Sequence, residues 1–326
     1  MRAVRIQEPG GPEVLHLGSV RRPEPGPEEL LVRVRSAAVN RADIFQREGH
    51  YPPPEGASEI LGLDVAGVVE EIGGEDHWLE PGDRVFGLVP GGGYAEYAVI
   101  HREMAMRVPD GLSFSEAAAV PEVFLTAYQA LFWLGRLEAG DRVLVHAGAS
   151  GVGTAAVQLA RAWRAGMIFT TSSGGKTDLC RRLGADRAID YETESFGRVV
   201  SEERGGGVEL VVDVVGAPYF QENVDVLATD GRIVVLAFLG GSVVETFDLR
   251  DLFRKRGRLV TSTLRSRSQT YQIALTREWA SFALPLLEEG RIAPVIDRTY
   301  PWQQVVEAHR YVEADRTRGK IVLEID

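Results

Sequence analysis

The sequence predicts an α/β protein in which a doubly wound parallel sheet is joined to a second domain built around a small, partly closed β-barrel. From about residue 115 to residue 263, segments typical of strands alternate with segments typical of helices. Apolar runs such as residues 211–215 suit strands buried on both faces. The first 110 residues instead combine β-branched stretches with many Gly and Pro turns. A chain of 326 residues suits two domains better than one core.

Composition excludes several classes of protein. The chain carries 36 Lys and Arg against 47 Asp and Glu, a formal net charge of −11, and 44% of its residues are hydrophobic. This composition is ordinary for a globular protein, so disorder, collagen-like repeats and coiled coils are poor interpretations. The acidic balance repels phosphate backbones, so we expect no nucleic-acid partner and no membrane surface.

Cysteine content and apolar segments predict a cytoplasmic protein. Cys180 is the only cysteine, so neither an intrachain disulfide nor a Cys-rich zinc module can form. Residues 1–5 lack the apolar run of a signal peptide. The longest central stretch without Asp, Glu, Lys or Arg, residues 143–160, is interrupted by Gly and Ser, which a membrane helix would not carry.

The elements are expected in two groups. In the β-rich domain, strands are expected at 30–35 and 65–70, and a turn at 81–83 leads into another strand. The parallel sheet is expected to contain six strands, at residues 143–147, 167–171, 187–191, 208–215, 232–238 and 258–263.

Helices and the chain end complete the predicted organisation. Helices are expected near 152–163, 176–183, 269–289 and 302–312. The last strand, residues 320–324, is expected to return to the first domain. The predicted β-rich domain therefore comprises residues 1–120 and 268–326, and the parallel-sheet domain comprises residues 121–267.

The strongest local signal is a glycine-rich turn at residues 146–153. It follows an apolar strand and opens a helix, so its glycines let the backbone approach a diphosphate while helix-start amides face the negative charge. The alternative is a tight turn that binds no ligand. The expected cofactor contacts here are Gly148, Ser150, Gly151, Val152 and Gly153.

The end of the second predicted strand indicates which cofactor binds. Enzymes that use NAD usually place Asp or Glu there, where it accepts from the ribose hydroxyls. Residues 170–176 contain no carboxylate. Two hydroxyls, Ser172 and Ser173, and the ammonium of Lys176 suit the 2′-phosphate of NADPH instead. The alternative is a solvated loop with one surface lysine.

Several motifs in one order resemble a known family. The chain resembles the zinc-independent, ζ-crystallin-like quinone oxidoreductases of the medium-chain dehydrogenase/reductases, and within them the p53-inducible members. The resemblance implies a GroES-like catalytic domain and a Rossmann domain, with NADPH in the cleft between them. The motifs that carry it are Asn40–Asp43, Gly49–Pro54, Ile60–Gly67, Gly91–Tyr97, Ala147–Gly153 and Gly319–Glu324.

Metal chemistry is not expected. Zinc-dependent relatives use a cysteine and a histidine at positions that correspond here to Asn40 and Leu63. An asparagine is a poor zinc ligand and a leucine is none. The resemblance therefore implies that no metal is bound.

The resemblance also implies site residues. Tyr51, Asn40 and Asp43 are expected beside the nicotinamide, and Tyr51 is expected to orient or protonate the substrate. Alternatively, Tyr51 anchors the proline loop that follows it, and Asp43 holds its own loop. The further cofactor contacts that the resemblance implies are Tyr51, Thr126, Tyr191, Ala237, Phe238, Leu239, Leu264 and Arg265.

Two positions depart from the usual family pattern. Ser150 stands where many members have glycine, and its hydroxyl is expected either to bind the diphosphate or to narrow the cleft. Arg164 stands near the usual glycine helix cap, so the helix end and the register of the next strand are uncertain. Histidines outside the glycine-rich turn, including His309, are interpreted as structural or solvated.

The resemblance implies NADPH-dependent quinone reduction by hydride or stepwise electron transfer, without metal. An enal or enone reductase with the same NADPH site is the alternative enzyme. A non-catalytic, NADPH-binding crystallin-like protein or an RNA-binding protein is the other alternative, and the net charge of −11 argues against RNA. A homodimer through the edge strand at residues 258–263 is expected.

Overall fold

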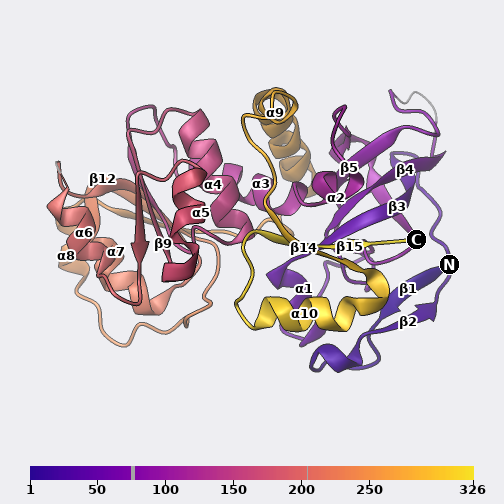
Figure 1. Ribbon diagram of the computed structural model, residues 1–326, viewed down its shortest axis with the longest axis horizontal. Helices are drawn as coiled ribbons and strands as arrows, with labels where there is room; N and C mark the ends of the chain where they lie inside the picture. The colour runs from indigo at the N-terminus through magenta and orange to yellow at the C-terminus, as the bar shows by residue number, and fades with distance from the viewer. Residues whose placement is uncertain (75–77, 204) are drawn as a thin grey trace. The chain divides into compact units, whose positions relative to one another are not determined.

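The computed structural model describes residues 1–74, 78–203 and 205–326, and these residues divide into two compact units (Figure 1). Unit 1 comprises Met1–Leu125 and Arg265–Asp326, and unit 2 comprises Thr126–Leu264. The predicted boundaries of the second domain, 121 and 267, lie five and three residues from these limits. Each unit is described by itself.

Unit 1 is the β-rich unit. Within its described residues, seven strands form one sheet. Six of them lie in the order β14-β15-β3-β4-β5-β7, and the seventh, β6, pairs with β3. A separate pair is formed by β1 and β2. The strands are β1 (Arg2–Arg5), β2 (His16–Ser19), β3 (Glu29–Val39), β4 (Asp64–Ile72), β5 (Arg84–Leu88), β6 (Tyr97–His101), β7 (Ala105–Arg107), β14 (Ile296–Pro301) and β15 (Lys320–Glu324).

Strand β3 curves this sheet. Along one side it pairs with β4, and along the other it pairs first with β6 and then with β15. Its register against β4 shifts twice, and such bulges bend a strand and increase its twist. The antiparallel pairing of Ile321 with Val39 joins the end of the chain to β3, as the sequence predicts.

The helices of unit 1 are mostly short. Asp43 caps the start of the helix that carries it, because its carboxylate accepts the Asn40 amide at 2.8 Å. The segments are η1 (Pro12–Val14), α1 (Arg41–Arg47), η2 (Arg102–Met104), α2 (Phe114–Ala118), α9 (Gln269–Glu288), η6 (Trp302–Gln304) and α10 (Val305–Glu313), while α3 (Pro121–Tyr128) crosses into unit 2.

Unit 2 holds a parallel sheet. Among its described residues, six strands lie in the order β10-β9-β8-β11-β12-β13, and every neighbouring pair is parallel. This is the doubly wound order of dinucleotide-binding domains, with its reversal between β8 and β11. The strands are β8 (Arg142–Val145), β9 (Met167–Ser172), β10 (Arg187–Asp190), β11 (Val208–Asp213), β12 (Leu227–Val235) and β13 (Arg258–Thr261).

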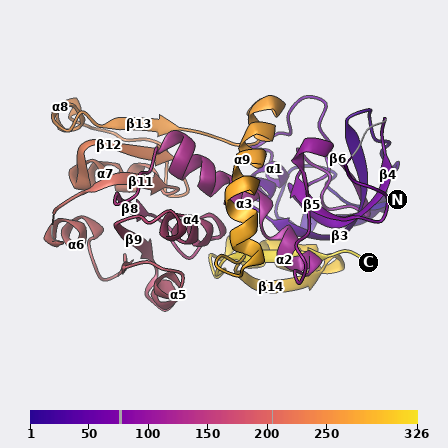
Figure 2. The ribbon, with the colours of Figure 1, turned by 90° about the horizontal axis from the view of Figure 1, so that it is seen from above.

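Helices connect the parallel strands (Figure 2). The helix after β8 packs against β8 and β9, and the one after β9 packs against β9 and β10. Apolar side chains of two further helices close a core over the sheet with Leu144, Phe169 and Ile233. The segments are η3 (Gln129–Leu134), α4 (Gly151–Ala162), η4 (Gly174–Lys176), α5 (Thr177–Arg182), α6 (Phe196–Glu202), η5 (Ala217–Tyr219), α7 (Phe220–Val226) and α8 (Leu249–Arg254).

The end of α4 is strained at one residue. Arg164 has φ of 65°, in the left-handed region that a glycine cap normally adopts. The helix ends at Ala162, and β9 keeps a regular parallel register with β8 from Met167 onward. The arginine therefore takes the cap conformation itself, and the following strand is not displaced.

Candidate functional site

The glycine-rich turn lies at the carboxyl end of β8 and leads into α4, as the sequence predicts. Ser150 is the N-cap of α4, and its Oγ accepts the Gly153 amide at 3.0 Å. A Cβ at Gly153 would lie 2.2 Å from the Ala147 carbonyl oxygen, and one at Gly148 would lie 2.6 Å from the Cβ of Thr170. The backbone is packed so closely that only glycine fits at these two positions.

This turn has the features that a dinucleotide diphosphate requires. It lies where the strand order reverses, which is where doubly wound sheets bind ligands. Gly151 and Val152 occupy the first turn of α4, where amides lack acceptors within the helix and attract anions. The hydroxyl oxygen of Ser150 is engaged in capping, so its expected role is to support the turn.

The two serines at the end of β9 differ in their exposure. Ser172 is 3% exposed, and its hydroxyl donates to the Ser173 carbonyl oxygen at 3.3 Å. Ser173 and Lys176 are half-buried. The latter two are therefore better placed than Ser172 to meet a phosphate group.

A carboxylate that the sequence analysis missed lies beside this loop. Asp190 ends β10, the strand paired with β9, and a Cβ at Gly174 would lie 2.5 Å from its Oδ2 atom. The segment 170–176 has no carboxylate of its own, but the sheet brings one from the neighbouring strand. A negative charge there opposes a 2′-phosphate. The next residue, Tyr191, is 49% exposed.

The remaining expected cofactor contacts of unit 2 lie in three segments. The loop after β12 carries Ala237, Phe238 and Leu239, of which the last two are about half exposed. This loop is tied to the one after β11, because Leu239 donates its amide to Val214 O at 3.1 Å. Thr126 and Leu264 stand at the two limits of unit 2.

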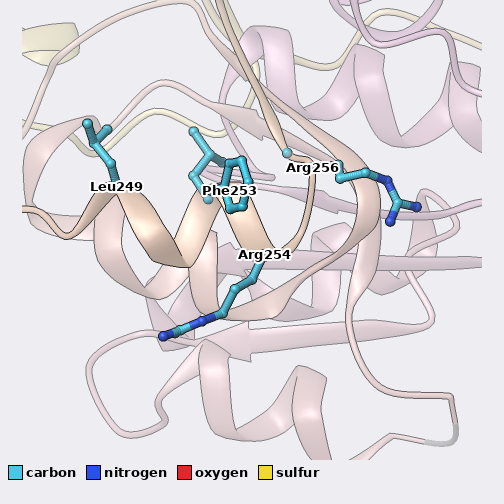
Figure 3. A pocket seen from close by; sticks show the side chains of 6 residues that line it. Leu249, Phe253, Arg254 and Arg256 are labelled. Atoms are coloured by element: carbon cyan, nitrogen blue, oxygen red, sulfur yellow. The ribbon is translucent and has the colours of Figure 1, made fainter.

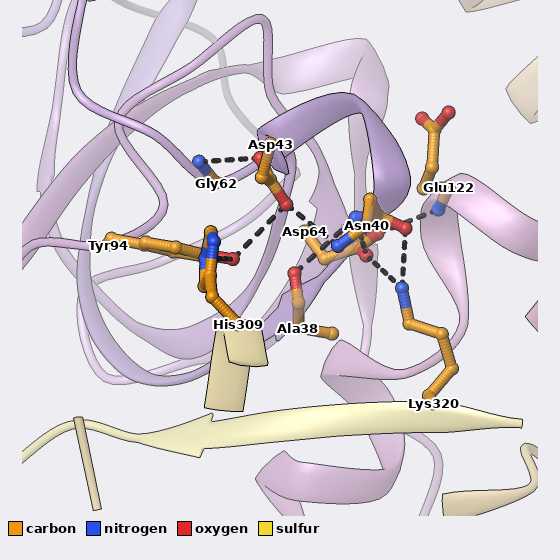
Figure 4. Close-up of polar contacts among 9 residues, drawn as sticks. All are labelled: Ala38, Asn40, Asp43, Gly62, Asp64, Tyr94, Glu122, His309 and Lys320. Atoms are coloured by element: carbon orange, nitrogen blue, oxygen red, sulfur yellow. Dashed lines mark hydrogen bonds and ion pairs between the residues drawn. The ribbon is translucent and has the colours of Figure 1, made fainter. Parts of the chain in front are cut away.

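In unit 1, Asn40 lies in a buried polar network (Figure 4). Its Nδ2 donates to Asp64 Oδ2 at 2.8 Å and to the Ala38 carbonyl oxygen at 3.4 Å, while its Oδ1 accepts from Lys320 Nζ at 2.6 Å. An amide group has two hydrogens. Both hydrogens have acceptors within unit 1, so Asn40 can meet a ligand only through its carbonyl oxygen.

Asp43 is buried and fully engaged in the same network. Its oxygens accept from the Asn40 amide, the Gly62 amide at 3.0 Å and the Tyr94 hydroxyl at 3.2 Å (Figure 4). Burial raises its pKa to about 6, against the lowering effect of the two backbone hydrogen bonds. These contacts favour the alternative interpretation of Asp43, in which it holds its loop.

Tyr51 and Arg265 lie close together in unit 1. The guanidinium carbon of Arg265 is 5.7 Å from the centre of the half-buried Tyr51 ring. Arg265 also donates to the Pro90 carbonyl oxygen at 2.6 and 2.9 Å and to Gln46 Oε1 at 2.7 Å. The arginine therefore joins segments of unit 1 around Tyr51.

Glu122 is a second carboxyl group that the sequence analysis missed. It is the second residue of α3, and its amide donates to Asp64 Oδ1 at 2.7 Å. Burial first, and then the Asp64 carboxylate, raises the pKa of Glu122 to about 7. Its charge in turn raises the pKa of Tyr51, after the larger effect of burial. A carboxyl group that titrates near neutrality therefore lies in the electrostatic neighbourhood of Tyr51.

His309 is buried at the far end of the network and is structural, as expected. Arg47 Nη1 lies 3.3 Å from its Nδ1, and its Nε2 lies 3.4 Å from the Tyr94 hydroxyl. Burial and the charge of Arg47 lower the pKa of His309 to about 3, so the ring is neutral. Its Nδ1 then accepts from Arg47, and its Nε2 donates to Tyr94.

The two positions that were compared with the zinc ligands of related enzymes, 40 and 63, carry an asparagine and a leucine. Leu63 is 1% exposed and offers no donor atom. Among residues 1–74, 78–203 and 205–326, no group of three or more His, Cys, Asp or Glu side chains is arranged to hold a metal ion. The described helices also include none with the length and apolar character needed to cross a membrane.

Comparison with known proteins identifies the family. Residues 26–110 match the alcohol dehydrogenase GroES-like domain, and residues 183–323 match the zinc-binding dehydrogenase family. The quinone oxidoreductase of Pseudomonas aeruginosa is 36% identical to the chain over 96% of each protein. The chain belongs to the quinone oxidoreductase family. This confirms the predicted resemblance to quinone oxidoreductases, while zinc independence and the finer likeness to the p53-inducible members stay predictions.

Solved structures agree with the fold of this family. A mycobacterial protein whose structure is complexed with NADPH is 31% identical, with a TM-score of 0.89 over the whole of both chains. An NAD-dependent alcohol dehydrogenase is also 31% identical, with a TM-score of 0.87 over the whole of both chains. Of these two similar structures, one therefore holds NADPH and the other is described as NAD-dependent.

Proposed function

We propose that this family member reduces quinones with NADPH and without a metal ion. The observation that carries the proposal is the glycine-rich turn at the reversal of the strand order, followed by the half-buried Ser173 and Lys176 after β9. Membership of the quinone oxidoreductase family supports the substrate class. The NADPH held by the mycobacterial relative supports the cofactor.

The residues of this chain are expected to bind and orient rather than to perform acid catalysis. When bound, a reduced nicotinamide supplies a hydride, or electrons in two steps, and a solvent proton completes the hydroquinone. Tyr51 offers a ring and a hydroxyl that position a flat substrate, and Arg265 fixes the ring. Asn40 offers only its carbonyl oxygen, because Asp64 and Ala38 take its hydrogens.

The alternative of an enal or enone reductase is favoured by one observation. Reduction of an enone needs a proton at the α-carbon, and a general acid works best when its pKa lies near the working pH. Glu122, with a pKa raised to about 7, meets that condition and interacts electrostatically with Tyr51. Under this alternative, Glu122 supplies the proton through Tyr51 or through water.

A single assay separates these functions. Purified protein is mixed with NADPH and a quinone, with NADPH and an enone, and with NADPH alone, and the loss of NADPH absorbance is followed. Turnover with the quinone alone supports the proposal, and turnover with the enone alone supports the alternative. Binding of NADPH without turnover of either acceptor would indicate a non-catalytic, crystallin-like protein. Retention of quinone turnover after dialysis against a chelator is expected, and its loss would contradict metal independence.

A homodimer through the edge of unit 2 is part of the proposal. β13 ends the parallel sheet, and sheet edges readily pair with a second chain. Beside it, α8 exposes Leu249 by 73% and Phe253 by 82%, and these two side chains line a shallow hollow with Arg254 and Arg256 (Figure 3). Exposed apolar residues of this size are typical of interfaces.

The dimer can be tested without disturbing the cofactor loops. Light scattering at micromolar concentration is expected to give the mass of two chains for the wild type and of one chain for Phe253→Asp. A wild-type monomer would contradict the dimer. A cytoplasmic location and the absence of nucleic-acid partners stay predictions from the sequence.

A further inference from the structure

A buried histidine at the start of the glycine-rich turn has no part in the function proposed so far. His146 directly follows β8 and is 1% exposed. Its ring packs against the rings of Phe196 and Tyr219, with centroid separations of 4.8 Å to each, and these two rings also contact each other at 5.0 Å. A polar ring in such a place costs stability unless both nitrogen atoms are hydrogen-bonded.

Both nitrogen atoms have partners. Nδ1 lies 2.9 Å from Thr171 Oγ1, and Nε2 lies 2.7 Å from Asn223 Oδ1. Asn223 in turn donates from Nδ2 to Asp213 Oδ2 at 3.1 Å. Because a carboxylate only accepts, this bond fixes the orientation of the Asn223 amide, and its Oδ1 must accept from the histidine.

The direction of every bond in the chain follows from this. His146 is neutral, because burial lowers its pKa against the raising effect of Asp213. Its single proton is therefore on Nε2, where it is donated to Asn223. The bare Nδ1 must accept the hydroxyl hydrogen of Thr171.

This chain of hydrogen bonds joins three loops at the carboxyl edge of the sheet. Thr171 lies near the end of β9 and accepts the Ala147 amide at 3.4 Å through its Oγ1 atom. Asp213 ends β11, and its other oxygen accepts the amides of Val215 and Gly216 at 2.7 and 3.1 Å. The loop after β11 is bonded to the loop after β12, in which Gly240 donates to Val215 O at 2.8 Å.

We propose that His146 is a positioning residue, which fixes the glycine-rich turn relative to the loops after β9 and β11 and so sets the geometry in which a whole dinucleotide is bound. This inference rests on the proposed cofactor site. Each loop is expected to meet a different part of the cofactor. Loss of the histidine should therefore weaken binding of the whole molecule more than binding of a fragment that touches one loop.

The test compares three substitutions. His146→Phe keeps an aromatic ring, which is somewhat larger than imidazole, but supplies neither hydrogen bond. His146→Gln supplies an acceptor and a donor on one planar group. The matched control is Val208→Ala, a fully buried residue at the amino end of β11, remote from the carboxyl edge along its strand. Dissociation constants are measured for NADPH and for adenosine 2′-monophosphate, a fragment that carries the 2′-phosphate but neither the diphosphate nor the nicotinamide half, together with the melting temperature of each variant.

His146→Phe is expected to weaken NADPH binding by about tenfold or more and to change binding of the monophosphate by less than about twofold. His146→Gln should stay within about threefold of the wild type for both ligands. Val208→Ala should lower the melting temperature without changing either affinity. If His146→Phe does not fold, Thr171→Val is used in its place with the same expected pattern, because it removes the hydroxyl that donates to His146 and accepts the Ala147 amide.

Three results would overturn the inference. The first is a loss of affinity in His146→Phe that is equal for NADPH and for the fragment. The second is an unchanged NADPH affinity in His146→Phe. The third is a loss of NADPH affinity in Val208→Ala in proportion to its fall in melting temperature. A wild-type protein that binds neither NADPH nor NADH would instead contradict the proposed function, so the two failures are distinguishable.

Discussion

Lys320 and Asp64 form a buried ion pair at the centre of unit 1. The ammonium nitrogen lies 3.0 Å from Asp64 Oδ2, and the two side chains are 4% and 0% exposed. The pair joins β15 to β4, strands separated by about 250 residues of sequence, and Asn40 bridges both partners (Figure 4). The charge of Lys320 also lowers the pKa of Glu122, against the larger raising effects of burial and of Asp64.

Removing the lysine should destabilise the protein strongly. Lys320→Met leaves Asp64 buried without its counter-ion, and breaking such pairs costs about 3–5 kcal/mol. Chemical denaturation monitored by circular dichroism measures the change. The double variant Lys320→Met with Asp64→Asn should recover much of the loss, since it removes the uncompensated charge. If Lys320→Met alone is as stable as the wild type, Lys320 does not compensate the buried charge of Asp64.

Glu122 should make stability depend on pH. Its folded pKa is raised from 4.5 to about 7, so its contribution to stability is fully present below pH 4.5 and is lost as the pH rises through about 7. Glu122→Gln cannot lose a proton. Between pH 5 and pH 8 the variant should therefore gain about 2–3 kcal/mol of unfolding free energy relative to the wild type.

Urea titrations at the two pH values measure this difference. The exposed Glu55→Gln is the matched control and should follow the wild type at both. A constant difference between Glu122→Gln and the wild type would contradict the raised pKa.

Cofactor choice should depend on two opposite charges at one loop. Lys176→Ala is expected to weaken NADPH binding by about tenfold to a hundredfold and to leave NADH binding almost unchanged, because only NADPH carries the 2′-phosphate. Asp190→Asn should act in the opposite sense and strengthen NADPH binding by about threefold or more. Titration calorimetry of the wild type and both variants with NADPH and NADH measures these affinities. Equal losses for NADPH and NADH in Lys176→Ala would contradict the 2′-phosphate assignment.

Local patterns predicted the fold well. The six parallel strands and the return of residues 320–324 to β3 follow the apolar runs, because such runs have few alternative placements. The glycine-rich turn was found because its glycines are required by contacts within a few residues, such as Gly153 with Ala147.

The polar networks could not be predicted in the same way. The Asp64 network joins residues 40, 64, 122 and 320, and no local pattern records which distant strands become neighbours. The only local signal was a charged residue at the start of an apolar strand, Asp64 in β4 and Lys320 in β15, which is costly to bury without a partner. Asp190 was missed for a related reason, since the sheet register rather than the sequence places it beside Gly174.

Arg164 offers a test of local strain. A residue other than glycine whose backbone is in the left-handed region lowers the stability of the protein by about 1 kcal/mol or more. Glycine adopts this conformation without that loss. Arg164→Gly should therefore stabilise the protein by about 0.5–1 kcal/mol. Ala162→Gly, two residues earlier in the last turn of α4, is the control and should destabilise by about 1 kcal/mol. Thermal denaturation of both variants decides the sign, and a destabilised Arg164→Gly would show that the arginine side chain contributes more than the strain costs.

The Tyr51 hydroxyl separates positioning from acid catalysis. In Tyr51→Phe the ring still packs beside Arg265, so only the hydroxyl is lost. With a quinone acceptor, turnover should fall by about tenfold at most, the effect of one positioning hydrogen bond. With an enone acceptor that needs a protein acid, the loss should be about 10²–10⁴-fold. Steady-state rates with each acceptor, together with the NADPH dissociation constant, distinguish the two. A thousandfold fall in quinone turnover at unchanged NADPH affinity would make Tyr51 a proton donor, and the quinone mechanism proposed here would then be wrong.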